Sequence, residues 1–309
     1  MSQPEKFVVS NEASQGLNFR SEPDPSDPTN IIATLPVNQE VIKLADAGVP
    51  NWWKVRTTIG GISKEGYVNR KFLRPAGSAS DVEVHTGVRA VHLPTTGKTV
   101  KRASKANLAY PLTENPPVQR AKDDPPAQRV EAIRQLIDWL NVPQSERYRP
   151  DGNTYCNIYA YDYCYFTGAY LPRVWWTGKA LIRLAAGEAV PVIYGETVNE
   201  KLANELNDWF KQWGADFGWR RTLDLNELQQ AANEGRVCIT VGKSKPGFHH
   251  GHGHIVAVVP ENDNFRATRS NGKVIELVKS QAGSVNFKYH VDHWWNDGTY
   301  EEFGHWIHD

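Results

Sequence analysis

Two of the three cysteines in this chain lie close together, in the segment TYCNIYAYDYCYF at residues 154–166. The third cysteine is Cys238, and no CxxC pair occurs anywhere. Three cysteines spaced in this way predict neither a disulfide framework nor a structural zinc site. A thiol in this segment is therefore either part of the core or a nucleophile, and a nucleophile needs a nearby base and a setting that favours the thiolate.

The position of each cysteine along the expected helix separates the two roles. The turn residues at 150–153 precede a helix that we expect to start near Thr154, which places Cys156 in the first turn. Unpaired amides and the positive end of the helix dipole favour a thiolate there. Cys164 lies two turns deeper, where the dipole no longer helps. We therefore predict that Cys156 is the nucleophile and that Cys164 packs in the core.

The base is expected within FHHGHGHIVAVV, residues 248–259. His254 begins the apolar strand HIVAVV, so its ring can stand at the end of a rigid element. His249, His250 and His252 lie in a glycine-rich loop, and loop histidines are usually solvated. His254 is therefore the candidate base.

The elements that must position these residues follow from the sequence pattern. Residues 6–75 read as short strands separated by turn clusters, and the following Pro-rich stretch reads as a linker or an extended strap. Helices are predicted over 127–141, over 197–213 with Thr197 and Glu200 in a capping-box pattern, and over 223–234. The segments RVCITVG, HIVAVVP, KVIELV and SVNFKYH then predict an antiparallel sheet, because their connections are too short for crossover helices.

The predicted fold class is thus α+β, in three parts. Residues 1–76 form a small all-β barrel, residues 77–126 a Pro-rich linker or strap, and residues 127–309 an α+β domain with an antiparallel sheet. The 309 residues carry 35 Lys plus Arg and 35 Asp plus Glu, so no net field favours nucleic acid or an anionic membrane as a partner. No apolar run has the length of a signal peptide or a membrane span, so we expect synthesis in the cytoplasm without a secretory signal.

Four motifs in the first part resemble a bacterial SH3-like domain. They are LNFRSEP, IIATLP, WWKV and GYVNRKFL, in the order usual for that family. The resemblance implies a binding or targeting role, often toward cell-wall peptide. The insert PDPSDPTN departs from the family pattern.

The last part, from about residue 145 to 309, resembles the NlpC-type papain-like cysteine peptidases and their CHAP-type amidase relatives. The matching motifs are CNIYAYDY, GAYLP, AANEGRVCITVG, GHIVAVV and SQAG. The resemblance implies cleavage of peptide or amide bonds in bacterial cell walls without a cofactor, with Cys156 as nucleophile and His254 as base. For the residue that orients the imidazole it favours Gln281, with Glu276 and Glu261 as alternatives.

This chain departs from the family in two places. Tyr155 precedes the cysteine where many relatives carry Asp, and the segment between the nucleophile and the base is longer than usual. In LPRVWW we predict that Arg173, Trp175 and Trp176 form a cleft wall that binds a charged muropeptide, the two tryptophans being core residues in the alternative reading.

The expected partner is therefore peptidoglycan or a muropeptide, with no nucleic acid and no membrane. A wall hydrolase without a signal would reach its substrate by non-classical export, as an antibacterial effector or lysin does, and a secretion machinery or an immunity protein would then be further partners.

Two other functions stay open. HGH at 252–254 resembles half of the zinc ligands of lysostaphin-type wall peptidases, although no HxxxD-like spacing precedes it. The second alternative is a non-catalytic wall-binding protein that acts through its SH3-like part.

Overall fold

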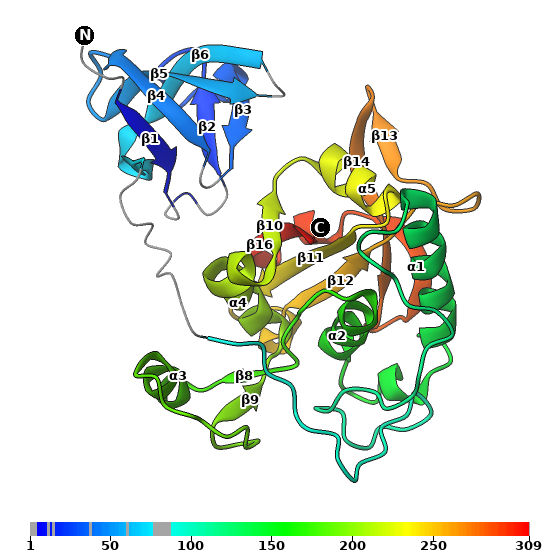
Figure 1. The fold of residues 1–309 in the computed structure, drawn as a ribbon. Helices are drawn as coiled ribbons and strands as arrows, with labels where there is room; N and C mark the ends of the chain where they lie inside the picture. Colours follow the sequence, from blue (N-terminus) through cyan, green and yellow to red (C-terminus); the bar gives the residue numbers. More distant parts are fainter. Residues whose placement is uncertain are drawn as a thin grey trace. The chain divides into compact units, whose positions relative to one another are not determined.

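The computed structural model describes residues 5–10, 13, 16–36, 39–59, 62–76 and 88–308. The chain divides into two compact units, Met1–Val84 and His85–Asp309 (Figure 1). The first unit is built on strands, and the second combines helices with an antiparallel sheet. The predicted α+β fold class, with an all-β N-terminal part, is therefore confirmed. No helix in the described ranges is long and apolar enough to cross a membrane.

The first unit is one antiparallel sheet of seven strands in the order β3-β2-β6-β5-β4-β1-β7. Side chains from several of these strands are fully buried and make its core, among them Val9, Phe19, Val41, Val55 and Val68. The four SH3-like motifs fall on β2, β3, β5 and β6. The strands are β1 Lys6–Val9, β2 Leu17–Arg20, β3 Ile31–Leu35, β4 Glu40–Asp46, β5 Trp52–Ile59, β6 Ile62–Asn69 and β7 Leu73–Pro75.

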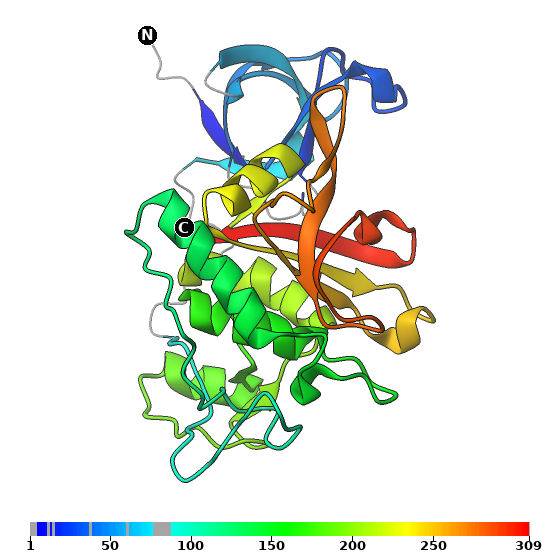
Figure 2. The same ribbon diagram turned by 90° about the vertical axis from the view of Figure 1, so that its right-hand side faces the viewer.

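The second unit contains an antiparallel sheet in the order β10-β16-β11-β12-β14-β13, with β15 also paired to β14. The predicted meander is confirmed as β11, β12, β14 and β15, and the C-terminal strand β16 inserts between β10 and β11. The β13–β14 hairpin projects from this unit in Figures 1 and 2. The strands are β10 Trp219–Thr222, β11 Val237–Ser244, β12 His254–Val258, β13 Thr268–Ser270, β14 Lys273–Gln281, β15 Phe287–Asp292 and β16 Tyr300–His308, and a small separate sheet pairs β8 Val174–Trp176 with β9 Val198–Glu200.

Helices pack against this sheet through their apolar faces. The helices are α1 Pro126–Leu140, α2 Cys156–Thr167, α3 Gly178–Ala185, α4 Ala203–Trp213 and α5 Leu225–Asn233. In α1 the buried residues include Ile133, Leu136, Ile137 and Leu140, at the spacing of one helix face. The helix α2 contacts α1 on one side and β12 on another, so it lies at the centre of the unit.

The second predicted helix begins later than the capping-box pattern indicates. Residues 198–200 form strand β9, and α4 begins at Ala203. The Thr197 hydroxyl bonds within the preceding loop, donating to the carbonyl of Pro191 at 2.6 Å. The Glu205 carboxylate accepts the backbone N–H of Leu202 at 3.0 Å, and so supplies the cap five residues beyond the one predicted.

The helix α2 is buried on almost every side. Ten of its twelve residues are buried, including Tyr159, Tyr161 and Tyr163. A helix that is apolar all round belongs in a core, and the aromatic residues of CNIYAYDYCYFT supply that surface. The helix begins at Cys156, two residues after the expected start near Thr154, so Cys156 lies in its first turn as predicted. Gly168 ends it with a left-handed φ of 82° that a residue without Cβ adopts at little cost.

Residues 88–125, which we call the strap, pack onto the second unit (Figures 1 and 2). Val91, Leu93, Val100 and Leu112 of the strap are buried in the same core as α1 and α2. The backbone N–H of Val91 donates to the Tyr170 hydroxyl at 2.9 Å. The two compact units divide between residues 84 and 85, so the strap belongs to the second unit. Residues 77–87 lie outside the described residues.

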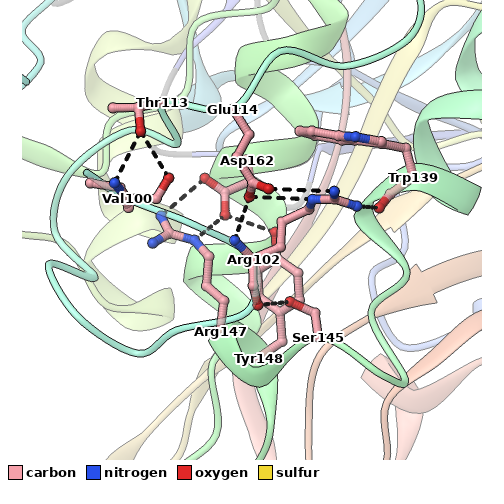
Figure 3. A network of polar contacts seen from close by, with 9 residues as sticks. All are labelled: Val100, Arg102, Thr113, Glu114, Trp139, Ser145, Arg147, Tyr148 and Asp162. Carbon is pink, nitrogen blue, oxygen red and sulfur yellow. Dashed lines mark hydrogen bonds and ion pairs between the residues drawn. The ribbon is translucent and has the colours of Figure 1, made fainter.

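A polar network fastens the strap to the helices (Figure 3). The Arg102 guanidinium pairs with Glu114 and donates to the carbonyl of Trp139 in α1. The Ser145 hydroxyl donates to the carbonyl of Arg102 at 2.7 Å. Because these bonds join strap residues to the end of α1 and the loop after it, they fix the position of the strap relative to α1.

The same region holds a fully buried ion pair. Arg147 Nε lies 2.6 Å from Asp162 Oδ2, and both side chains have no exposed surface. The Tyr148 hydroxyl donates to the same carboxylate at 2.8 Å, and Arg147 Nη2 donates to the strap carbonyl of Tyr110 at 2.9 Å. Asp162 projects from the middle of α2, so the pair links that helix to the strap.

We predict that Asp162→Asn lowers the free energy of unfolding by about 3–5 kcal/mol, because it leaves the Arg147 charge buried without its counter-charge. Urea denaturation followed by tryptophan fluorescence measures this loss. Asp208→Asn is the matched control, since Asp208 pairs with Lys211 and Lys243 at a half-exposed surface position and its loss costs at most about 1 kcal/mol. Equal effects of the two substitutions would contradict the role of the buried pair.

A second prediction concerns the boundary. A fragment of residues 85–309 should unfold cooperatively, whereas a fragment of residues 127–309 should fail to fold, because removal of the strap exposes part of the core. Circular dichroism and thermal unfolding of both fragments check this. A stable and cooperative 127–309 fragment would restore the boundary that the sequence indicates.

Candidate active site

A pocket of about 810 Å³ opens at the start of α2. Cys156, His254 and Gln281 all line it, and they come from α2, β12 and β14 respectively. Leu108 of the strap also lines this pocket. The three side chains that the sequence analysis singled out for catalysis are therefore brought to one cavity, from positions far apart along the chain.

Cys156 is the first residue of α2 and is 5% exposed. Burial raises the pKa of its thiol, while the backbone N–H groups of Ile255, Asn157 and Cys156 itself, together with the charge of Arg173, act in the opposite direction. The expectation that the helix start lowers this pKa is therefore wrong in its net direction, because desolvation outweighs the amides. At neutral pH the group is a thiol.

The other two cysteines are fully buried. Burial raises the pKa of Cys164 well above its usual value. Neither Cys164 nor Cys238 lines the pocket. What distinguishes Cys156 from them is access to the pocket and the surrounding N–H donors, not a lowered pKa.

His254 begins β12, as predicted, and Gly253 sets its position. A Cβ at residue 253 would lie 2.2 Å from the carbonyl oxygen of Gly242 and 2.4 Å from Asn204 Oδ1. Only glycine allows the chain to approach β11 this closely. In the resulting register His254 lies opposite Gly242 in the β11–β12 pair. The imidazole is thus carried by a strand whose start is sterically defined.

The His254 ring is held by contacts on two sides. Its Nε2 lies 2.8 Å from Gln281 Oε1, and the Trp294 ring meets it edge-on at a centroid distance of 4.8 Å. Burial lowers the pKa of His254 to about 4, although the bond to Gln281 opposes this shift. At neutral pH the imidazole is therefore uncharged and can accept a proton.

The two alternative orienting residues lie elsewhere. The Glu276 carboxylate bonds to Thr268 and to His293 Nδ1, and Glu261 bonds to Asn233 and Arg269. Neither carboxylate lines the pocket. Of the three candidates named from the sequence, the structure thus places Gln281 alone beside the imidazole.

The predicted cleft wall LPRVWW is divided between the pocket and the core. Arg173 lines the pocket, while Trp175 and Trp176 do not and are 4% and 3% exposed. The Trp175 ring packs against Trp209, and Trp176 Nε1 donates to a strap carbonyl. The prediction that both tryptophans bind substrate is corrected, because successive residues of β8 are buried on both faces of this short strand.

Arg173 is 3% exposed and is held in place by two of its nitrogens. Nη2 pairs with Glu200 at 2.9 Å, and Nε donates to the strap carbonyl of Leu108 at 3.2 Å. Nη1 has no hydrogen-bond partner among the described residues. A buried guanidinium nitrogen that is left free beside a pocket can donate to an anionic or carbonyl group bound there.

Asn157 and Asp162 of α2 make structural contacts. Asn157 Nδ2 donates to the carbonyl of Lys201 at 2.9 Å, and Asp162 belongs to the buried ion pair with Arg147. Neither side chain bonds to His254 or Gln281.

Several pocket residues carry no signal in the sequence. Tyr300 lines the pocket from the start of β16, and its ring stacks on that of His249 at 5.0 Å. His249 Nε2 also bonds to Thr299, while its side chain is exposed, as expected for a histidine of this loop. Only tertiary folding brings β16 to the pocket.

The described residues contain no group of three or more His, Cys, Asp or Glu side chains that could hold a metal ion, so HGH at 252–254 does not gather a zinc ligand set here.

Comparisons with known proteins add little to this geometry. No protein-family model matches the chain, and a search of curated proteins found no match. Two solved structures from Trichomonas vaginalis are similar at a low level. NlpC2 is 10% identical with a TM-score of 0.24, over 100% of this chain and 73% of that one. NlpC1 is 11% identical with a TM-score of 0.24, over 100% of this chain and 69% of that one. The function is therefore argued from the site itself.

We predict that iodoacetamide modifies Cys156 in the native protein and leaves Cys164 and Cys238 unmodified until the protein unfolds. The reason is access, since Cys156 alone among them lines the pocket. Peptide mapping by mass spectrometry after timed alkylation measures this. His254→Ala should slow the reaction of Cys156, because it removes the base that accepts the thiol proton. Equal labelling of all three cysteines in the folded protein would contradict the assignment.

Proposed function

We propose that this protein is a thiol hydrolase that cleaves peptide or amide bonds, with Cys156 as nucleophile, His254 as general base and acid, and Gln281 as the residue that orients the imidazole. One observation carries the proposal. The thiol at the start of α2 and a neutral imidazole bonded to a glutamine line the same open pocket. That arrangement supplies a nucleophile, a base and an orienting group, the three parts that acyl transfer requires.

In the proposed reaction His254 takes the proton of Cys156 as the sulfur attacks the carbonyl carbon. Because both groups are uncharged at rest, this transfer accompanies the attack and does not precede it. The backbone N–H groups at the start of α2 are free of helical partners and can donate to the developing oxyanion. The imidazolium then protonates the leaving amine, and water hydrolyses the thioester with the imidazole again as base.

We propose bacterial cell-wall peptides as the substrate class. The support comes from the sequence motifs that resemble wall peptidases, and from Arg173. Its free Nη1 suits a carboxylate, and peptidoglycan stem peptides carry carboxylates beside their cleavable amide bonds. The first unit is then a wall-binding module. Such a substrate lies outside the cytoplasmic membrane, so this function requires export of the protein.

The prediction that tests this function is digestion of purified peptidoglycan, with soluble products analysed by liquid chromatography and mass spectrometry. The wild-type protein should release new fragments, and Cys156→Ala and His254→Ala should release none. Gln281→Ala should slow release, because the imidazole loses its orienting bond. Cys164→Ala is the matched control and should retain activity, since it removes a thiol from the same helix away from the pocket.

The outcomes separate the proposal from its alternatives. New amino and carboxyl termini in the fragments identify the bond that is cut. Release that persists in Cys156→Ala but stops with a chelator would favour the zinc peptidase. Co-sedimentation of the wild-type protein with peptidoglycan without any release would favour a binding protein.

A further inference from the structure

Lys279 is a buried lysine beside the candidate catalytic residues. It lies on β14 two residues before Gln281, and its side chain is 3% exposed. Lysine is rarely buried unless its charge is paired. Here the ammonium lies 2.7 Å from Asp292 Oδ2 and 3.0 Å from Gln281 Oε1. The pair with Asp292 compensates the buried charge, and the contact with Gln281 needs a separate explanation.

That contact fixes which way the Gln281 amide points. An ammonium group can only donate hydrogen bonds, so the atom it contacts must be the amide oxygen. The amide nitrogen then points away and donates to the carbonyl of Val285 at 3.1 Å. The two ends of a glutamine amide are nearly equivalent in shape, so its orientation depends on such contacts. Without the lysine, the bond to the Val285 carbonyl is left as the contact that opposes turning the amide over, and the preference for one orientation is weaker.

The orientation of the amide in turn fixes the imidazole of His254. Its Nε2 lies 2.8 Å from the same oxygen that Lys279 contacts, so Nε2 must carry a proton to make this bond. In the neutral ring Nδ1 is then unprotonated. This is the tautomer in which Nδ1 can accept a proton from Cys156.

We propose that Lys279 is a positioning residue, which holds the Gln281 oxygen toward His254 and thereby selects the imidazole tautomer that accepts the thiol proton. The inference rests on the proposed function for its catalytic meaning. It adds a fourth residue, Lys279, to the set that the motif analysis named, and Asp292 as its counter-charge.

The charge of Lys279 has a second effect, which the same geometry requires. A positive charge near the ring disfavours the imidazolium, whereas a carboxylate favours it. Loss of the Lys279 charge should therefore raise the pKa of His254 from about 4 toward the ordinary 6.5, and loss of the Asp292 charge should lower it further. Burial remains the largest cause of the low pKa, so neither change reaches 6.5. The groups facing His254 are Cys156 from α2, His249 from the turn before β12, Lys279 and Gln281 from β14, Asp292 from β15, and Trp294 and Tyr300 from the C-terminal region.

The test is a pH titration of the full-length protein labelled with ¹⁵N in its histidine rings, followed by NMR. The His254 signals are assigned by their absence in His254→Ala. In the wild type we expect a proton on Nε2 and a titration near pH 4. Lys279→Met should give a mixture of tautomers and a higher pKa, and Lys279→Arg should keep the wild-type behaviour because it retains a charged donor. Lys288→Met is the control. Lys288 lies on the neighbouring strand β15 and its charge pairs with Asp138, so this substitution removes a lysine charge that does not contact Gln281.

Asp292→Asn should shift the titration in the opposite direction to Lys279→Met. A purely structural effect of either substitution would not produce opposite shifts. The proposal is overturned if Lys279→Met titrates like Lys288→Met with an unchanged tautomer. Should Lys279→Met fail to fold, Asp292→Asn decides, because an unchanged or raised pKa there overturns the proposal. This titration needs no substrate, so absence of wall hydrolysis with these shifts intact would reject the proposed function alone.

Discussion

The buried ion pair between Arg147 and Asp162 is the interaction on which the rest of the second unit depends. Burying two charges costs several kcal/mol each, and the pair recovers that cost only where geometry and further hydrogen bonds are good. Here Tyr148 adds a hydrogen bond to the carboxylate and the strap carbonyl of Tyr110 accepts one from the guanidinium. Because Asp162 projects from the centre of α2, the requirement to satisfy this carboxylate fixes the position of the helix that presents Cys156. The strap consequently helps to position the residue at the start of the pocket helix.

Burial shapes the chemistry of the site in the same way. Desolvation disfavours every charged form, so it raises the pKa of the Cys156 thiol and lowers that of the His254 imidazole. Both changes favour an uncharged pair at rest. The backbone N–H groups around the sulfur therefore matter most once negative charge develops during attack, when they can stabilise it without having stabilised the ground state.

The class of fold, a helix start close to Cys156 and a strand start at His254 could be predicted from the sequence, because these rest on local signals. Turn residues before a helix and a histidine that opens an apolar strand are each visible in a short window, whereas Gln281 was indicated only by the family resemblance. The failures share a physical cause, namely tertiary contact overriding local pattern. Thr197 and Glu200 have a capping-box spacing, but Glu200 lies in strand β9, which pairs with β8, and Thr197 lies in the loop before it. The Pro-rich composition of 88–125 resembles a linker, yet scattered apolar side chains such as Val91 and Val100 bury it.

The strap also explains why the pocket wall could not be predicted from the motif LPRVWW alone. Arg173 reaches the pocket because Leu108 and Glu200 take two of its nitrogens, and one of those partners lies 65 residues earlier in the chain. The guanidinium is thus oriented by two segments, the strap and strand β9. Only β9 pairs with the strand β8 that neighbours Arg173 in the chain. A change in the strap would therefore alter the orientation of Arg173 without touching Cys156 or His254. Arg173 and the start of α2 are in this way positioned by different contacts: the strap carbonyl of Leu108 orients Arg173, and the pair of Arg147 with Asp162 holds the helix that presents Cys156.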